Sequence, residues 1–180
     1  MSATEIKFGG FGGQGVILAG IIIGRAASLY NNQFATLTQS FGPEARGSAC
    51  SAQVIVSDTK VLYPYVTRPE ILLVMSQEAC NKFLPEATDN ATVIIEEDLV
   101  KPQNLKPGMK IYGIPATRLA EELGRKMILN IVMVGFFTSV TKLVDYEAAR
   151  EAVKASVPPG TEDMNLKAFE RGYQYGLSLK

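Results

Sequence analysis

The pattern of hydrophobic and polar positions predicts a strand, a turn and a helix at the start of the chain. Residues 4–8 alternate between polar and apolar side chains, as in a half-buried strand, and residues 9–15 are rich in glycine. Residues 14–30 carry apolar and small side chains at helical spacing, and Asn31-Asn32 ends this run. A second strand is predicted at 33–38, so these segments predict the opening of a βαβ unit.

The remainder of the chain predicts short strands, then mostly helices. Residues 39–51 are small, polar and turn-forming and predict a loop, which is followed by a strand at 52–56 and a return strand at 61–63. The later predicted strands are 71–75, 92–96 and 110–114, and the later predicted helices are 77–85, 116–123, 129–144, 146–155 and 165–179. We therefore expect one domain over residues 1–180, of the α/β class: a Rossmann-like, three-layer, mostly parallel sheet with a helical C-terminal third.

Composition and charge narrow the classes of function. The chain is 47% hydrophobic and 20% charged, and its formal net charge is zero. Nucleic-acid-binding domains are usually basic, so we do not expect nucleic acid as a partner. The apolar run 16–23 is shorter than the roughly 20 residues that a membrane span needs, and no basic segment precedes it as in a secretory signal. A cytoplasmic protein without a membrane attachment is expected.

The inventory of reactive side chains argues against self-contained chemistry. The sequence has no histidine, the usual general base and the commonest metal ligand. Its two cysteines, Cys50 and Cys80, lie far apart and show no CxxC spacing. We therefore expect neither a metal site nor independent hydrolytic chemistry.

A glycine motif follows the first predicted strand. Gly10, Gly12 and Gly15 satisfy G-x-G-x-x-G directly before a predicted helix. Glycine allows positive φ and a close approach of the backbone to a ligand, and a helix N-terminus offers free N–H groups to an anion. Gly10, Gly12, Gly13, Gln14 and Gly15 are therefore candidates to hold a phosphate or the diphosphate of coenzyme A. Alternatively, they only permit a tight turn. NAD is disfavoured because no acidic residue ends the second predicted strand.

Four more polar residues are candidate ligand contacts. Gln39 and Ser40 follow the second predicted strand, at the sheet edge where open α/β folds bind ligands, although they could equally cap a turn. Arg46 has a guanidinium suited to phosphate or carboxylate, with a local ion pair to Glu44 as the alternative. Asn130 begins the long apolar helix and is either a site residue or an N-cap or first-turn residue of that helix.

Five segments carry a resemblance to a known family: GGFGGQGV at 9–16, TQSFGPEARG at 38–47, PEILLVMSQEA at 69–79, NIVMVG at 130–135 and NLKAFERG at 165–172. They resemble the γ subunits of 2-oxoacid:ferredoxin oxidoreductases, members of the pyruvate/ketoisovalerate oxidoreductase family. The resemblance runs in order along nearly the whole chain, and the SFGPEARG segment is most similar to the 2-oxoglutarate branch. Ser48 departs from the pattern, since family members often have glycine there.

The resemblance implies a division of labour among subunits. In such enzymes thiamine diphosphate and Mg²⁺ lie between the α and β subunits, and cysteine-rich segments elsewhere hold 4Fe–4S clusters. A 2-oxoacid is oxidatively decarboxylated, electrons pass to ferredoxin, and the acyl group passes to coenzyme A. The γ chain would then hold no cofactor alone, assist coenzyme A binding, and depend on α, β and in some complexes δ subunits. A purely structural docking subunit and a free-standing nucleotide-binding oxidoreductase are the alternatives.

Overall fold

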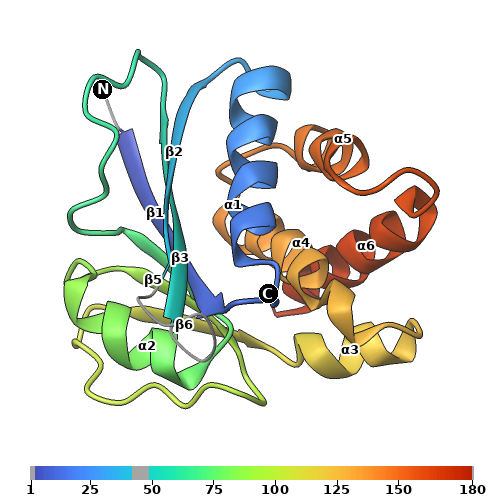
Figure 1. Ribbon diagram of the computed structural model, residues 1–180. Helices are drawn as coiled ribbons and strands as arrows, with labels where there is room; N and C mark the ends of the chain where they lie inside the picture. The colour runs from blue at the N-terminus through green and yellow to red at the C-terminus, as the bar shows by residue number, and fades with distance from the viewer. Residues whose placement is uncertain (1–2, 42–48, 180) are drawn as a thin grey trace.

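The computed structural model describes residues 3–41 and 49–179 and shows a six-stranded sheet with helices on both faces (Figure 1). The order of strands across the sheet is β2-β3-β1-β4-β5-β6. Pairing is parallel from β1 through β4 and β5 to β6, whereas β3 is antiparallel to both of its neighbours, β1 and β2. The predicted α/β class with a mostly parallel sheet is confirmed. The strands are β1 (Ala3–Phe11), β2 (Phe34–Ser40), β3 (Ala49–Ser57), β4 (Ile71–Val74), β5 (Thr92–Glu96) and β6 (Lys110–Ile114).

The helices divide unequally between the two faces of the sheet. Figure 1 shows α2 on one face, with α1, α4, α5 and α6 stacked on the other. The helices that follow the last strand, α3 to α6, make the C-terminal third helical, as predicted. In the described ranges no helix is both long and apolar enough to cross a membrane. The helices are α1 (Val16–Arg25) with the π-helical extension η1 (Ala26–Tyr30), α2 (Gln77–Phe83) with the 3-10 turn η2 (Leu84–Glu86), α3 (Ala116–Glu122), the 3-10 turn η3 (Lys126–Ile128), α4 (Leu129–Thr141), α5 (Tyr146–Ser156) and α6 (Glu162–Ser178).

Apolar cores lie on both faces of the central strands. Along β4, Ile71 and Leu73 pack in the larger core under α1 and α4, whereas Leu72 and Val74 pack in the smaller core with α2. Successive side chains of a strand point to opposite faces, so a strand that is covered on both sides is apolar throughout. This explains the unbroken apolar run that predicted a buried parallel strand.

The predicted glycine turn is shorter than expected. Gly9 and Gly10, assigned to the turn, are strand residues because they pair with Ser51 and Cys50 of β3. The helix begins at Val16, two residues later than predicted. The ladder with β3 therefore carries the strand into the glycine motif, and only its second half turns.

The second strand also differs from its prediction. Gln39 and Ser40, placed after the strand, are its last two residues and pair with Ala52 and Ser51. Both ends of the predicted loop 39–51 belong to strands, since β2 ends at Ser40 and β3 begins at Ala49. The simple βαβ opening was incomplete as well, because β3 lies between β1 and β2. The return strand at 61–63 was wrong, since residues 60–66 contain no strand.

Candidate functional site

The glycine turn lies at the point where the chain changes faces of the sheet. β1 and β4 are parallel neighbours, and the helices that follow them, α1 and α2, lie on opposite faces (Figure 1). In open α/β sheets such a change of side leaves a crevice at the carboxyl ends of the two strands, and ligands bind there. The fold therefore puts the turn at the position where this architecture favours a site.

The turn itself is a tight β-turn that leads into α1. The Gln14 N–H donates to the carbonyl oxygen of Phe11 at 3.1 Å. Gly13 and Gly15 have φ of 93° and 76°, in the left-handed region that favours glycine. Among the described residues, no atom would lie within 4 Å of a Cβ placed on Gly12 or Gly13, so the outer side of the turn is open there. The space above the turn can thus admit a ligand or a partner chain.

The N-terminus of α1 opens on the same space. The first helical hydrogen bond runs from the Ala19 N–H to the Gly15 oxygen at 3.0 Å. The N–H groups of residues 16–18 come before this bond and have no partner within the helix, as at any helix N-terminus. Such groups, with the partial positive charge of the helix end, favour an anion.

Two predicted site residues hold the turn through their side-chain amides. Gln14 accepts a hydrogen bond from the Phe11 N–H at Oε1 (2.7 Å), and its Nε2 donates to the Met75 oxygen at 2.9 Å. Asn130, which is buried in the first turn of α4, donates from Nδ2 to the Gly15 oxygen at 3.3 Å. Both amides therefore stabilise the turn from within the chain.

A shallow pocket of about 320 Å³ lies beside the turn. Its walls are glycine backbone and apolar side chains, with Phe11 and Phe41 exposed at 37% and 69%. Cys50 is buried there, and burial raises the pKa of its thiol, which disfavours the reactive thiolate. The pocket can hold an apolar or stacked group next to the anion-favouring helix end. Its lining residues are Phe11, Gly12, Gly13, Gly15, Val16, Ile17, Leu18, Phe41 and Cys50.

The structure brings some predicted site residues together and separates others. Gly10, Gly12, Gly13, Gln14, Gly15 and Asn130 form one cluster around the turn. Gln39 and Ser40 lie at the same edge of the sheet, but β3 stands between β2 and β1, so they are two strand spacings away, roughly 10 Å. Arg46 lies outside the described residues.

A charged residue that the sequence prediction missed lies at the same edge of the sheet. Glu96 ends β5 with no exposed surface, and no described group hydrogen-bonds to its Oε2. Burial raises the pKa of this carboxyl, and the hydrogen bond that its Oε1 accepts from the Asp98 N–H offsets part of this rise. Arg118, by contrast, pairs with Asp98 at 2.6 Å. The sequence signal was a glutamate that closes an apolar strand.

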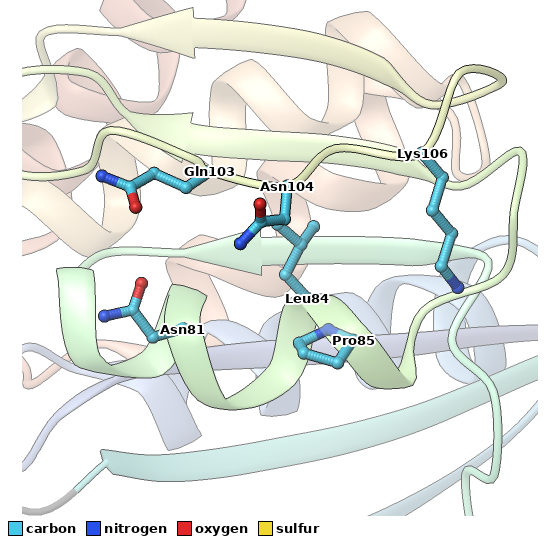
Figure 2. A pocket seen from close by; sticks show the side chains of 6 residues that line it. All are labelled: Asn81, Leu84, Pro85, Gln103, Asn104 and Lys106. Atoms are coloured by element: carbon cyan, nitrogen blue, oxygen red, sulfur yellow. The ribbon is translucent and has the colours of Figure 1, made fainter.

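A larger pocket of about 430 Å³ lies between α2 with η2 and the connection from β5 to β6. Figure 2 shows Asn81 on α2 and Asn104 on that connection, both extending toward the space between the two segments. The ammonium group of Lys106 is held by the Ala87 oxygen at 2.7 Å and by Asp89 at 3.0 Å. No residue of the glycine turn lines this pocket.

The described residues offer no donor set for the metal groups of the resembling enzymes. In 3–41 and 49–179 no three histidine, cysteine, aspartate or glutamate residues are grouped as around a metal ion. A 4Fe–4S cluster takes four thiolates, whereas this sequence has two cysteines, both buried. The described residues therefore do not fit a 4Fe–4S cluster, and they do not group acidic side chains as around a Mg²⁺ ion.

The structure is a Rossmann-like α/β domain, and its glycine turn lies at the switch point of the sheet. This arrangement is typical of ligand-binding or docking domains. The pyruvate ferredoxin/flavodoxin oxidoreductase family model matches residues 5–175, so the chain belongs to this family. The resemblance to γ subunits that the motifs indicated is confirmed.

Individual relatives agree with this assignment. The chain is 45% identical to the 2-oxoglutarate synthase subunit KorC of Methanocaldococcus jannaschii, over 97% of this chain and 95% of that subunit. It is similar to the solved γ subunit of a keto/oxoacid ferredoxin oxidoreductase from Geobacter sulfurreducens PCA, with a TM-score of 0.88, 35% identity, and coverage of 99% of this chain and 98% of that one.

A larger solved chain shares the fold. The 2-oxoglutarate:ferredoxin oxidoreductase from Magnetococcus marinus, solved with 2-oxoglutarate, coenzyme A and succinyl-CoA bound, superposes with a TM-score of 0.89. The match covers all of this chain but 32% of that one, at 19% identity, and so shows the fold alone.

Proposed function

We propose that this chain is the γ subunit of a cytoplasmic 2-oxoglutarate:ferredoxin oxidoreductase. The complex would oxidatively decarboxylate 2-oxoglutarate, pass the electrons to ferredoxin and transfer the succinyl group to coenzyme A. The observation that carries this proposal is the 45% identity to a 2-oxoglutarate synthase subunit over nearly the full length of both chains.

Within the complex, the chain forms one wall of the coenzyme A site and closes over the reaction centre of its partners. The open side of Gly12 and Gly13 and the N-terminus of α1 would receive the diphosphate. Gln39 and Ser40 would contribute polar contacts from the same sheet edge, and the guanidinium of Arg46 would add a positive charge for the phosphates. The apolar pocket beside the turn supports this role because coenzyme A also carries an adenine ring that stacks on apolar groups.

The redox and decarboxylation chemistry belongs to partner subunits. Thiamine diphosphate with Mg²⁺ would supply the carbanion-stabilising centre, and 4Fe–4S clusters would carry the electrons, both on α, β or δ chains. The lack of histidine and the presence of two buried cysteines in this sequence support that division.

Purification of the tagged chain from its host tests the assignment. We expect larger partners to co-purify, with iron–sulfur absorbance and with methyl viologen reduction that requires 2-oxoglutarate and coenzyme A. Activity with pyruvate in place of 2-oxoglutarate would contradict the assignment of 2-oxoglutarate as the substrate. A chain that purifies alone and binds NAD(H) would contradict the family role.

Two substitutions separate coenzyme A binding from simple docking. Arg46→Ala should raise the KM for coenzyme A about tenfold, as expected for the loss of one charge-assisted hydrogen bond. Arg68→Ala, which removes an exposed arginine before β4, is the control and should leave the KM for coenzyme A unchanged. A Cβ on Gly12 would meet no atom of the described residues within 4 Å, so a failure of Gly12→Ala to assemble would instead favour a docking surface at the turn.

A further inference from the structure

The hydrogen-bond ladder between β1 and β4 is interrupted at the glycine turn. Gly9 pairs with Val74, and the Met75 N–H continues the ladder by donating to the Gly9 oxygen at 2.9 Å. In a regular parallel pair the next bond would run from the Phe11 N–H to the Met75 oxygen. Instead, each of these two groups bonds to the side chain of Gln14, at 2.7 Å and 2.9 Å.

The Gln14 carboxamide therefore takes the place of one backbone-to-backbone bond. Its oxygen accepts from one strand and its nitrogen donates to the other, so the two strands stand one amide group further apart than a direct bond allows. Gly10 makes room for this arrangement, because a Cβ there would lie 2.7 Å from Gln14 Oε1. The strands thus separate at the switch point, where the ligand crevice of this architecture opens.

We propose that Gln14 is a positioning residue that sets the opening between β1 and β4 and thereby aims the backbone of the turn at the diphosphate of coenzyme A. This inference rests on the proposed coenzyme A role. Each polar atom of the carboxamide has a partner within the chain, so Gln14 acts on the ligand through the turn. An amide meets the requirement at every pH, since it offers a donor and an acceptor on one planar group, whereas a carboxyl does so only when it is protonated.

Substitutions at Gln14 in the assembled complex test this role. Gln14→Met keeps the length and removes both bonds, and Gln14→Glu keeps the acceptor but turns the donor toward Met75 into a second acceptor. For each we expect the KM for coenzyme A to rise about tenfold, the size of one net hydrogen bond, and the KM for 2-oxoglutarate to stay unchanged. Hydrogen–deuterium exchange of peptides over residues 9–15 should become faster.

Two further variants make the test specific. Gly10→Ala leaves the amide chemically intact but displaces it, and should reproduce the effect of Gln14→Met. Asn31→Asp is the matched control: its amide also bridges two segments, donating to Gln33 and accepting from the Asp145 N–H, but at the amino end of the sheet. It should leave the KM for coenzyme A unchanged.

The pH profile distinguishes the hydrogen bond from a general structural defect. Lowering the pH protonates the carboxyl introduced by Gln14→Glu and restores a donor toward the Met75 oxygen, so the KM for coenzyme A should fall toward that of the wild type. The KM of Gln14→Met should show no such recovery.

The possible outcomes separate this inference from the proposed function. A wild-type complex without coenzyme A dependence would overturn the proposed function. A wild-type complex with normal coenzyme A dependence, together with an unchanged KM in Gln14→Met, would overturn the positioning role alone. An equal rise in the KM for both substrates would also overturn it. If Gln14→Met does not assemble, Gly10→Ala and Gln14→Glu at low pH decide between these results.

Discussion

Gly15 is subject to two constraints that only glycine meets. Its φ of 76° is left-handed, and a Cβ there would lie 2.3 Å from the amide nitrogen of Asn130. The same nitrogen donates to the Gly15 oxygen, so it cannot withdraw without losing that bond. The start of α1 and the start of α4 are thus in direct contact at this residue.

An alanine series along the turn measures these constraints separately. Gly15→Ala should lower the free energy of unfolding by about 2–3 kcal/mol, because strain and overlap add. Gly13→Ala, with φ of 93° and open space, should cost about 1 kcal/mol. Gly12→Ala, with open space and no positive φ, should stay within about 0.5 kcal/mol. Urea denaturation of the three variants checks this order, and equal effects at Gly12 and Gly15 would refute it.

At the scale of elements, α4 and α6 pack closely because glycines lie at their contact. A Cβ on Gly172 would stand 1.9 Å from the backbone oxygen of Val132, and one on Gly135 would stand 2.0 Å from that of Phe169. No side-chain rotation relieves an overlap with backbone. The apolar α4, buried along residues 129–139, is therefore a core helix of this chain.

Gly172→Ala should force the two helices apart and lower the free energy of unfolding by about 3 kcal/mol. Gly24→Ala on α1 is the matched control, since its nearest atom would lie 4.0 Å away. That change should stabilise the protein by about 0.5–1 kcal/mol through the better helix propensity of alanine. Thermal or urea denaturation measures both, and a neutral Gly172→Ala would contradict the close packing.

At the scale of the whole molecule, the buried Glu96 makes stability depend on pH. Burial raises the pKa of its carboxyl above the ordinary value of 4.5, so the folded chain binds the proton more tightly than the unfolded chain. The stability that this tighter proton binding contributes is complete at a pH below 4.5, the ordinary pKa of the carboxyl. It is lost as the pH rises from 4.5 through the raised pKa of the folded chain.

Glu96→Gln should remove that dependence, because glutamine stays neutral at every pH. We expect the variant to be more stable than the wild type near neutral pH, with the difference shrinking toward pH 4.5. Urea denaturation across this range measures it. Glu121→Gln, which changes an exposed carboxyl on α3, is the control and should keep the wild-type profile. A difference that grows toward low pH would reverse the sign and refute the argument.

The pattern of hydrophobic and polar residues predicted much of the fold because helices, strands and turns depend on residues that are close in the sequence. β4 was predicted from an unbroken apolar run, and α5 from its spacing of apolar residues. The glycine motif indicated where a turn would follow a strand. Boundaries shifted where pairing decided them: Gly10 and Ser40 are strand residues because β3 supplies their hydrogen bonds.

The sequence by itself determined the α/β class, the family and the cluster of glycines, since these depend on residue types at short spacing. The tertiary structure alone decided the order of strands and the partners of the two amides. Gln14 reaches Met75 across 61 positions, and Asn130 reaches Gly15 across 115. Hydrogen bonds over such separations form only when the sheet and α4 have brought their elements together, so no local pattern encodes them.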